Sequence, residues 1–254
     1  MRSKWLYLPI ELKVRDLHSR ILLASFAATR GIRSIIGHKL EVQNKSEEFP
    51  PGIFLMYGFA DNYSNILDTI TKKNHKVVAQ DDEGLVVWQN DMYQKFRVSS
   101  SALEKVSQVY AWGQNQKQLI DDWSPLSKEK ILVTGSPRFD LLRKPFIQAL
   151  DLDVKNIKNK IGSYILINTN FGRANHFKGT KYYIQTKLEQ YATDNKSSDF
   201  FEGCLGFQKV IYNRFIEMIF ELSSRFSEKQ IIIRPHPSEN HDVWRNYTKH
   251  LSNV

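Results

Sequence analysis

The stretch WLYLPIELKVRDLHSRILLASFAATRGIRSIIG, residues 5–37, decides the fold class of this 254-residue chain. Residues 5–10 form a short apolar run and predict a strand, and residues 34–37 predict the next strand. Between them, residues 16–30 predict a mostly buried helix closed by Gly31. The apolar positions of this helix are Leu17, Ile21, Leu22, Ala24, Phe26 and Ala28. A strand, a helix and a second strand in this order are typical of α/β proteins with a parallel sheet.

The same alternation continues along the chain and predicts a first domain over residues 1–142. Further strands are expected at 53–58, 75–80, 108–113 and 131–135, and helices at 61–73 and 114–123. A unit of about 140 residues is within the usual size range of a domain.

A second α/β unit is predicted over residues 162–254, after a linker at 143–161 that is rich in Lys and Asn. Its strands are expected at 164–170 and 230–237, and its helices at 206–227 and 243–251. Two such units joined by a linker predict twin Rossmann-like domains with a ligand cleft between them.

Composition excludes several classes of protein. The single cysteine, Cys204, excludes an internal disulfide and a CxxC metal site, and fits a reducing cytoplasm. The scattered histidines lack the spacing of a metal site, so neither a metal nor a cofactor is expected. The net charge of +9 is spread along the chain without an RNA-binding or zinc-finger signature, which argues against nucleic acid. No apolar run is long enough to span a bilayer, so we expect a soluble or peripheral protein.

Short enzyme signatures of other α/β classes do not occur. The chain has no GxGxxG after its first strand, no GxxxxGK[ST] and no GxSxG. A dinucleotide oxidoreductase, a P-loop NTPase and an α/β-hydrolase are therefore all disfavoured.

In parallel sheets ligands bind beyond the carboxyl ends of the strands, which draws attention first to the acidic cluster Asp81-Asp82-Glu83-Gly84. Like charges this close raise at least one pKa, which suits a general base or a carboxylate nucleophile. A glycine lets the backbone approach a ligand closely. The alternative is an ordinary acidic turn or helix cap.

A second cluster follows the last strand, where Arg234 and His236 flank a proline. An Arg and a His held at a strand end are suited to donate to phosphate oxygens. Ser238, Glu239 and Asn240 come next, and one of them is expected to cap the following helix, whose N-terminus also favours an anion. A rigid structural turn is the alternative.

Two further strand ends carry weaker signals. Arg138 and Asp140 follow a Gly-Ser-Pro turn and could form a local ion pair. Asn168 and Asn170 can cap, form a turn or bind sugar hydroxyls equally well.

Taken together, these clusters resemble a known set of motifs. Asp82-Glu83-Gly84 and His236-Pro237 are similar to the acidic and His-Pro motifs of bacterial sialyltransferases and β-Kdo transferases with the GT-B fold. The sequence resembles the bacterial surface carbohydrate biosynthesis proteins more closely still. That resemblance runs through YLPIELKVRDLHSRILLASFAATRG, DDEGLV, VTGSPRFDLL, ILINTNF and RPHPSEN, in this order.

The resemblance implies a metal-free transferase that moves a Kdo- or nonulosonate-type sugar from a CMP donor to a surface glycan or glycolipid. Glu83, the first choice, or Asp82 would be the acceptor-side base. Asp140 would be the nucleophile if configuration is retained. His236 and Arg234 would hold the CMP phosphate, and Arg138 would pair with the sugar carboxylate. Asn168, Asn170, Ser238 and Glu239 complete the expected binding residues.

The family pattern also continues past the His-Pro motif, so the resemblance predicts a second domain that is incomplete at its C-terminus. Two alternatives therefore stay open: an inactive remnant that binds nucleotide or glycan, and a UDP-sugar epimerase or polyol-phosphate transferase on the same scaffold. The expected location is the cytoplasm, with peripheral contact to the anionic inner membrane where lipid-linked acceptors lie.

Overall fold

The computed structural model describes residues 4–87, 89–123, 129–191 and 195–254. The chain divides into two compact units, residues 1–149 and 150–254. The division falls inside the segment 143–161. Part of that segment is regular, since a 3-10 helix, η4 (Phe146–Leu150), leads into helix α8 (Asp151–Ile161). Helix α8 was not predicted, because none of its side chains is buried and the segment therefore shows no clear apolar period.

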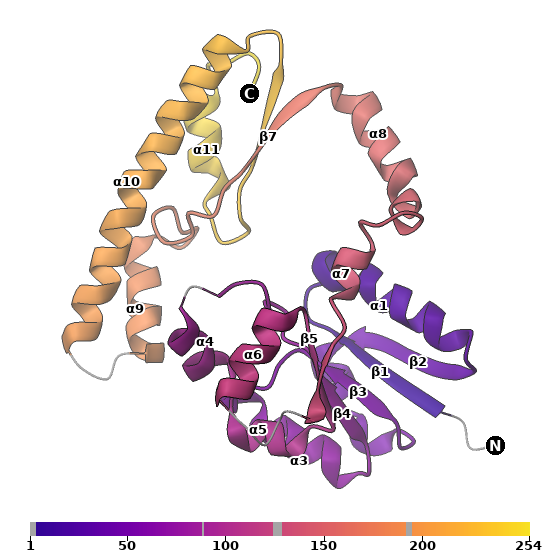
Figure 1. Ribbon diagram of the computed structural model, residues 1–254. Coiled ribbons are helices and arrows are strands. Elements are labelled where there is room, and N and C mark those ends of the chain that lie inside the picture. Colours follow the sequence, from indigo (N-terminus) through magenta and orange to yellow (C-terminus); the bar gives the residue numbers. More distant parts are fainter. Residues whose placement is uncertain (1–3, 88, 124–128, 192–194) are drawn as a thin grey trace. The chain divides into compact units, whose positions relative to one another are not determined.

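The first unit is built on a six-stranded sheet with the order β2-β1-β3-β4-β5-β6 (Figure 1). All of its neighbouring strands pair in parallel, as the alternating pattern predicts. Each expected strand forms within a few residues of its predicted bounds. The strands are β1 (Lys4–Ile10), β2 (Ile32–His38), β3 (Ile53–Met56), β4 (Lys76–Ala79), β5 (Gln108–Ala111) and β6 (Ile131–Val133).

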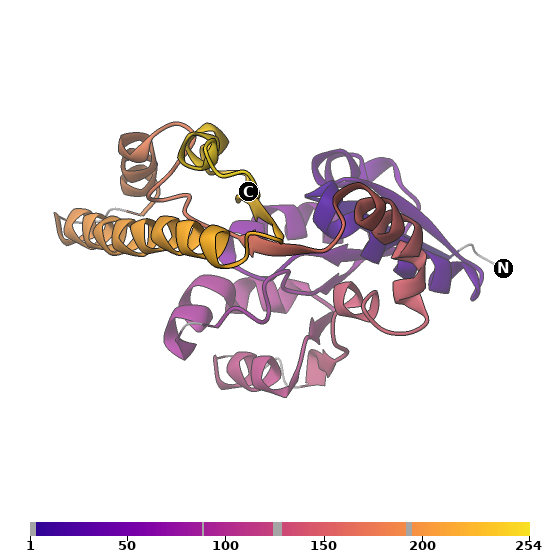
Figure 2. The ribbon, with the colours of Figure 1, turned by 90° about the horizontal axis from the view of Figure 1, so that it is seen from above.

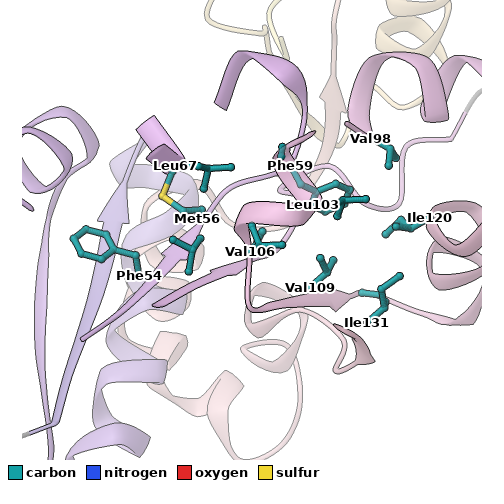
Figure 3. Packing of buried hydrophobic residues seen from close by; sticks show 14 of the residues in the cluster. Phe54, Met56, Phe59, Leu67, Val98, Leu103, Val106, Val109, Ile120 and Ile131 are labelled. Atoms are coloured by element: carbon teal, nitrogen blue, oxygen red, sulfur yellow. The ribbon is translucent and has the colours of Figure 1, made fainter. Parts of the chain in front are cut away.

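One face of this sheet carries the main hydrophobic core. Phe54 and Met56 are fully buried there on the side of Leu67 from α3, and Ile120 from α6 lies at the other end of the same core, near Ile131 (Figure 3). Helices α2, α3, α5 and α6 all supply residues to this core. The helices of the unit are α1 (Lys13–Ala28), α2 (Lys39–Asn44), α3 (Ser64–Lys72), α4 (Asn90–Arg97), α5 (Ser100–Lys105), α6 (Gln114–Trp123) and α7 (Pro137–Asp140), with 3-10 turns η1 (Ser46–Glu48) and η2 (Asp61–Tyr63).

The opposite face has a smaller core under α1. Leu8, Leu55 and Val78 alternate with the residues of the main core, so the central strands are buried on both sides, as parallel strands usually are. Leu23 and Ala24 of α1 pack on them. Figure 2 shows the same sheet from above.

The prediction that α1 is mostly buried is wrong. Its buried residues are Asp16, Ser19, Arg20 and Ala27, whereas Val14, Ile21 and Phe26 are exposed. The helix begins three residues earlier than expected, directly after β1, and turns a polar face inward. Gly31 has φ +69°, the left-handed conformation that closes helices, as expected.

The second unit contains a parallel pair of strands, β7 (Tyr164–Asn168) and β8 (Gln230–Arg234). The helices beside them are α9 (Thr180–Tyr191), the long α10 (Asn195–Arg225) and α11 (His241–Thr248). Ile167 and Ile231 of the strands pack on Tyr212, Ile219 and Trp244 of α10 and α11. Helix α10 starts well before the predicted residue 206, and α9 was not predicted.

Among the described residues, no helix combines the length and apolar character that crossing a bilayer requires.

Candidate functional site

The strand order places a crevice at the carboxyl end of the first sheet. The chain leaves β1 toward β2 on one side and later enters β3 on the other side, so β1 and β3 are neighbours whose connections diverge. Such a switch point is where ligands bind in open α/β sheets. Glu11, Lys39, Tyr57 and Asp82 each follow closely after one of the strands β1 to β4, and therefore gather at this edge.

Arg15, in the first turn of α1, joins three carboxylates at the crevice. Its guanidinium donates to Asp82 Oδ2 at 2.8 Å, to Glu11 Oε2 at 3.0 Å and to Asp16 Oδ1 at 2.6 Å. Lys39 contributes a second ion pair with Glu11. One guanidinium thus pairs with three carboxylates, so it stabilises the ionised form of Asp82 less than an exclusive ion pair would.

The three carboxylates differ in their pKa. Burial raises the pKa of Asp82 to about 6, although Arg15, Arg20 and Arg138 pull it down. Burial acts on Asp16 and Glu11 too, but hydrogen bonds hold their pKa below the usual values. Asp16 accepts from Arg15 and from the backbone of Leu12, and Glu11 accepts from Lys39 and Arg15. A carboxyl group that titrates near neutral pH, beside acids that stay ionised, has the properties of a general base.

The neighbours of Asp82 in the acidic cluster have different surroundings. Asp81 is buried and accepts from Tyr93 Oη at 2.9 Å and from the backbone N–H of Glu83 at 3.0 Å, so it fixes the turn. The Glu83 side chain is 51% exposed and forms an ion pair with Arg97. Of the two candidate bases, Asp82 therefore occupies the crevice and Glu83 lies outside it.

Gly84 is required by packing inside the protein. A Cβ added to it would lie 2.6 Å from Gln116 Nε2 and 2.8 Å from Trp112 Cδ1. The Trp112 indole N–H donates to the carbonyl of Asp81 at 2.7 Å, so Trp112 and Gly84 together hold the acidic turn in place. The predicted close approach was to a ligand and stays a prediction, whereas the groups that the Gly84 backbone approaches here are side chains of the chain itself.

The predicted cluster after β6 meets the acidic turn. Arg138 donates to the backbone carbonyl of Asp82 and its guanidinium lies 5.1 Å from the centre of the Trp112 ring. Asp140 pairs with Arg143 at 3.4 Å, not with Arg138, so the local ion pair considered for Arg138 and Asp140 does not form.

A cavity of about 620 Å³ opens on the other side of the acidic turn. Its lining combines Gly84 and Trp112 with the amide side chains of Asn90, Asn115 and Gln118. Amides both donate and accept hydrogen bonds, as sugar hydroxyls do, and an indole offers an apolar surface.

Sequence reasoning missed most of the crevice, namely Glu11, Arg15, Asp16, Arg20, Lys39 and Tyr57. A usable signal was present in α1, where Asp16, Ser19 and Arg20 share one helical face at spacings of three and four residues. The apolar residues of the same helix drew attention away from it.

In the second unit the loops after β7 and β8 pack against each other around Glu239. Glu239 is 2% exposed and accepts hydrogen bonds from Thr169 Oγ1 at 2.7 Å, the backbone N–H of His236 at 2.9 Å and Trp244 Nε1 at 2.9 Å. Its two oxygens are therefore occupied by the protein. Glu239, predicted as a binding residue, holds the loop that carries His236.

His236 is exposed and its orientation is set by its neighbours. Its Nδ1 accepts from the backbone N–H of Ser238 at 3.2 Å and lies 2.7 Å from Ser238 Oγ. Because Nδ1 is an acceptor, the proton of the neutral ring belongs on Nε2, which can donate to a ligand. Gly172 permits this arrangement, since a Cβ there would lie 2.3 Å from Ser238 Oγ.

The other predicted residues of this unit lie at the same loops. Arg234, Asn168 and Asn170 are exposed at the ends of β8 and β7. Asn240 is the N-cap of α11, with Oδ1 accepting from the N–H of Asp242 at 3.0 Å, which confirms that one of residues 238–240 caps this helix. The two clusters predicted for this unit thus meet each other.

In the described part of the chain, no three His, Cys, Asp or Glu side chains are grouped so that they could hold a metal ion. A scan of protein-family models and a search among curated proteins each find no match for this chain. The class that the fold and its sites define is a parallel α/β protein with a Rossmann-like sheet and polar residues at its switch point.

Proposed function

We propose that this protein is a glycosyltransferase of surface polysaccharide synthesis with Asp82 as the general base. The observation that carries the proposal is the carboxyl group of Asp82, which lies at the switch point of a parallel sheet with its pKa raised to about 6. A base of this kind is half ionised close to working pH and can accept a proton from a hydroxyl group. Its place beside Gly84 agrees with the resemblance to GT-B transferases that use CMP-sugars.

The proposed step is a substitution at the anomeric carbon. The acceptor hydroxyl gives its proton to Asp82, and its oxygen attacks the anomeric carbon of a Kdo- or nonulosonate-type sugar. The bond from that carbon to the phosphate oxygen breaks, and CMP leaves with the electron pair. In the second unit, His236 Nε2–H and the exposed Arg234 are the donors that we propose for the phosphate of CMP.

The cavity beside Gly84 is the proposed place of the acceptor. Its amide side chains suit neutral sugar hydroxyls, and Trp112 suits the apolar face of a pyranose ring. Asp82 belongs to the same turn but does not line the cavity, so an acceptor bound there would extend beyond the cavity to bring its hydroxyl to the base.

The test is transfer or release of CMP from CMP-Kdo and CMP-N-acetylneuraminate, compared between Asp82→Asn and Glu83→Gln. We expect Asp82→Asn to lower kcat by about two to four orders of magnitude, whereas Glu83→Gln stays near wild type. The wild-type rate should rise with pH through about 6, because the ionised form of Asp82 is the active one. Loss of activity in Glu83→Gln alone would move the base to Glu83. Binding of UDP in preference to CMP, or no turnover of either donor by the wild-type protein, would refute the proposal.

A further inference from the structure

Arg20 is a buried cation without an ion pair among the described residues, although its charge acts on Asp82 and lowers the pKa of that carboxyl group. The residue is 5% exposed, and its Nε has no hydrogen-bond partner. Its guanidinium lies over the Tyr57 ring, 5.3 Å from the ring centre. Burial of a charged group without a hydrogen bond or an ion pair is costly, so such a group is unusual in a folded protein. The arrangement indicates that a partner from outside the chain belongs here.

Tyr57, which contacts Arg20, also has a buried polar atom without a hydrogen-bond partner in the described residues. The residue is 2% exposed, and this atom is its hydroxyl oxygen. Burial raises the pKa of this phenol, so it stays protonated and can donate. An N–H and an O–H donor on two side chains in contact, both without acceptors, suit one ligand group with two acceptor oxygens.

The charges around the pair indicate how much negative charge the ligand carries. Arg15 and Lys39 are the partners of Asp16, Glu11 and Asp82. With Arg20 the three cations balance the three carboxylates while Asp82 is ionised, and one positive charge is left over once Asp82 has taken up a proton. One negative charge on the ligand would then restore the balance. A phosphate dianion would bring excess negative charge close to three carboxylates. A carboxylate group fits better.

We propose that Arg20 and Tyr57 bind the carboxylate of the substrate at the switch point, with Arg20 Nε–H and Tyr57 O–H donating to its two oxygens. This inference rests on the proposed function, since ulosonate sugars carry a carboxylate on the anomeric carbon that Asp82 serves. It assigns to Arg20 and Tyr57 the role that sequence resemblance gave to Arg138, whose guanidinium is engaged by the Asp82 carbonyl and the Trp112 ring.

The side chains at the rim supply the route of access. Lys39 Nζ lies 5.9 Å from the centre of the Tyr57 ring and pairs with Glu11. The side chains of Lys39 and Glu11 are 27% and 37% exposed, whereas Arg20 and Tyr57 are buried. Opening this surface ion pair costs little and would uncover the two donors.

The experiment measures thermal stabilisation of the full chain by pyruvate and by Kdo, against glucose, inorganic phosphate and sodium chloride at equal ionic strength. Pyruvate tests the carboxylate alone, whatever sugar the natural substrate contains. We expect the melting temperature to rise with pyruvate and more steeply with Kdo, because a ligand that binds only the folded state stabilises it. Glucose and chloride should have no such effect.

Three variants separate a binding role from a structural one. Arg20→Met and Tyr57→Phe remove the unpaired donors, so Kd for Kdo should rise at least about tenfold while both free proteins stay folded. Arg33→Met is the matched control, because Arg33 also lies over an aromatic ring, that of Trp5 at 5.5 Å, but is exposed on β2. It should bind Kdo as the wild type does.

The proposal is overturned if Arg20→Met melts lower than wild type and still binds Kdo, since Arg20 is then structural. It is also overturned if phosphate stabilises more than pyruvate and Kdo, or if no carboxylate stabilises at all. If Kdo binds through Arg20 but no CMP-sugar is turned over, the carboxylate site stands and the proposed transferase function fails.

Discussion

Two acids, the buried Glu239 and the partly buried Asp82, one in each unit of the chain, show how differently a carboxylate can be accommodated. Glu239 follows β8 and receives three hydrogen bonds at 2.7–2.9 Å from a side-chain hydroxyl, a backbone amide and an indole. Asp82 follows β4 and shares one guanidinium with Glu11 and Asp16. Burial raises the pKa of Asp82 to about 6.

The number of hydrogen bonds that each carboxylate receives distinguishes a structural role from a role in ligand binding. A carboxylate whose oxygens are all occupied by the protein fixes a loop and has nothing left to offer a ligand. A carboxylate that is desolvated and only partly compensated is held in a less favourable state, and such strain is typical of functional sites. Arg20 and Tyr57, which have unpaired polar atoms, belong with Asp82 in the second category.

The largest expected effect follows from removing the satisfied acid. Glu239→Ala leaves the hydroxyl of Thr169, the amide of His236 and the indole of Trp244 without acceptors, which should cost at least about 3 kcal/mol of stability. Hydrogen exchange should speed up in β7 and β8 while β1 and β3 stay protected. Unchanged exchange in β7 and β8 would contradict a supporting role for Glu239.

The isosteric change of the other acid should act in the opposite direction. Asp82→Asn should raise the stability of the first unit by about 3 kcal/mol at pH 7, the worth of a shift from 3.8 to about 6. Below pH 4 the carboxyl is protonated in both the folded and the unfolded chain, so the variant has no such advantage. As pH rises from 4 to 6, the unfolded chain releases this proton first and the wild type loses stability. The difference in unfolding free energy between Asp82→Asn and wild type therefore grows over this range.

Urea unfolding of wild type and Asp82→Asn from pH 4 to 8 measures this window, with Glu83→Gln as the control because Glu83 is exposed. A variant that is less stable than wild type at pH 7 would mean that the ion pair with Arg15 outweighs the cost of burial. Asp82 would then resemble Glu239, and the comparison between the two acids would fail.

The smallest expected effect concerns the group that Glu239 supports. His236→Ala should weaken CMP binding by about 2 kcal/mol, or roughly thirtyfold in Kd, through the loss of a charge-assisted hydrogen bond from Nε2. Calorimetry with CMP measures the change. His18→Ala is the control, because His18 is an exposed histidine of the first unit. Equal CMP affinity in His236→Ala and wild type would leave the loop as a structural turn.

Much of the fold could be predicted because strands and helices of this kind are local patterns. The apolar runs at 5–10, 53–58 and 131–135 form strands, and helix 114–123 forms with the predicted bounds. Parallel pairing followed from the alternation of strands and helices. The short helices α4, α5 and α8 were missed, since six to eleven residues with few buried side chains leave little periodicity to detect.

The candidate site was predictable only in part. The rule that ligands bind at carboxyl ends of strands selected Asp82, Arg138 and His236, and the structure brings Arg138 to the acidic turn. The rule could not tell Asp82 from Glu83, because adjacent residues in a turn point in different directions.

By itself the sequence determined that strands alternate with helices, and therefore that chemistry-bearing residues collect at one edge of a parallel sheet. Only the tertiary structure decided which of them matter. The order β1-β3-β4 brings Arg20, Tyr57 and Asp82 together from three separate segments, and this depends on which strands become neighbours. The pKa of Asp82 depends on burial and on how one guanidinium is shared, and both are properties of the folded chain that residue order does not express.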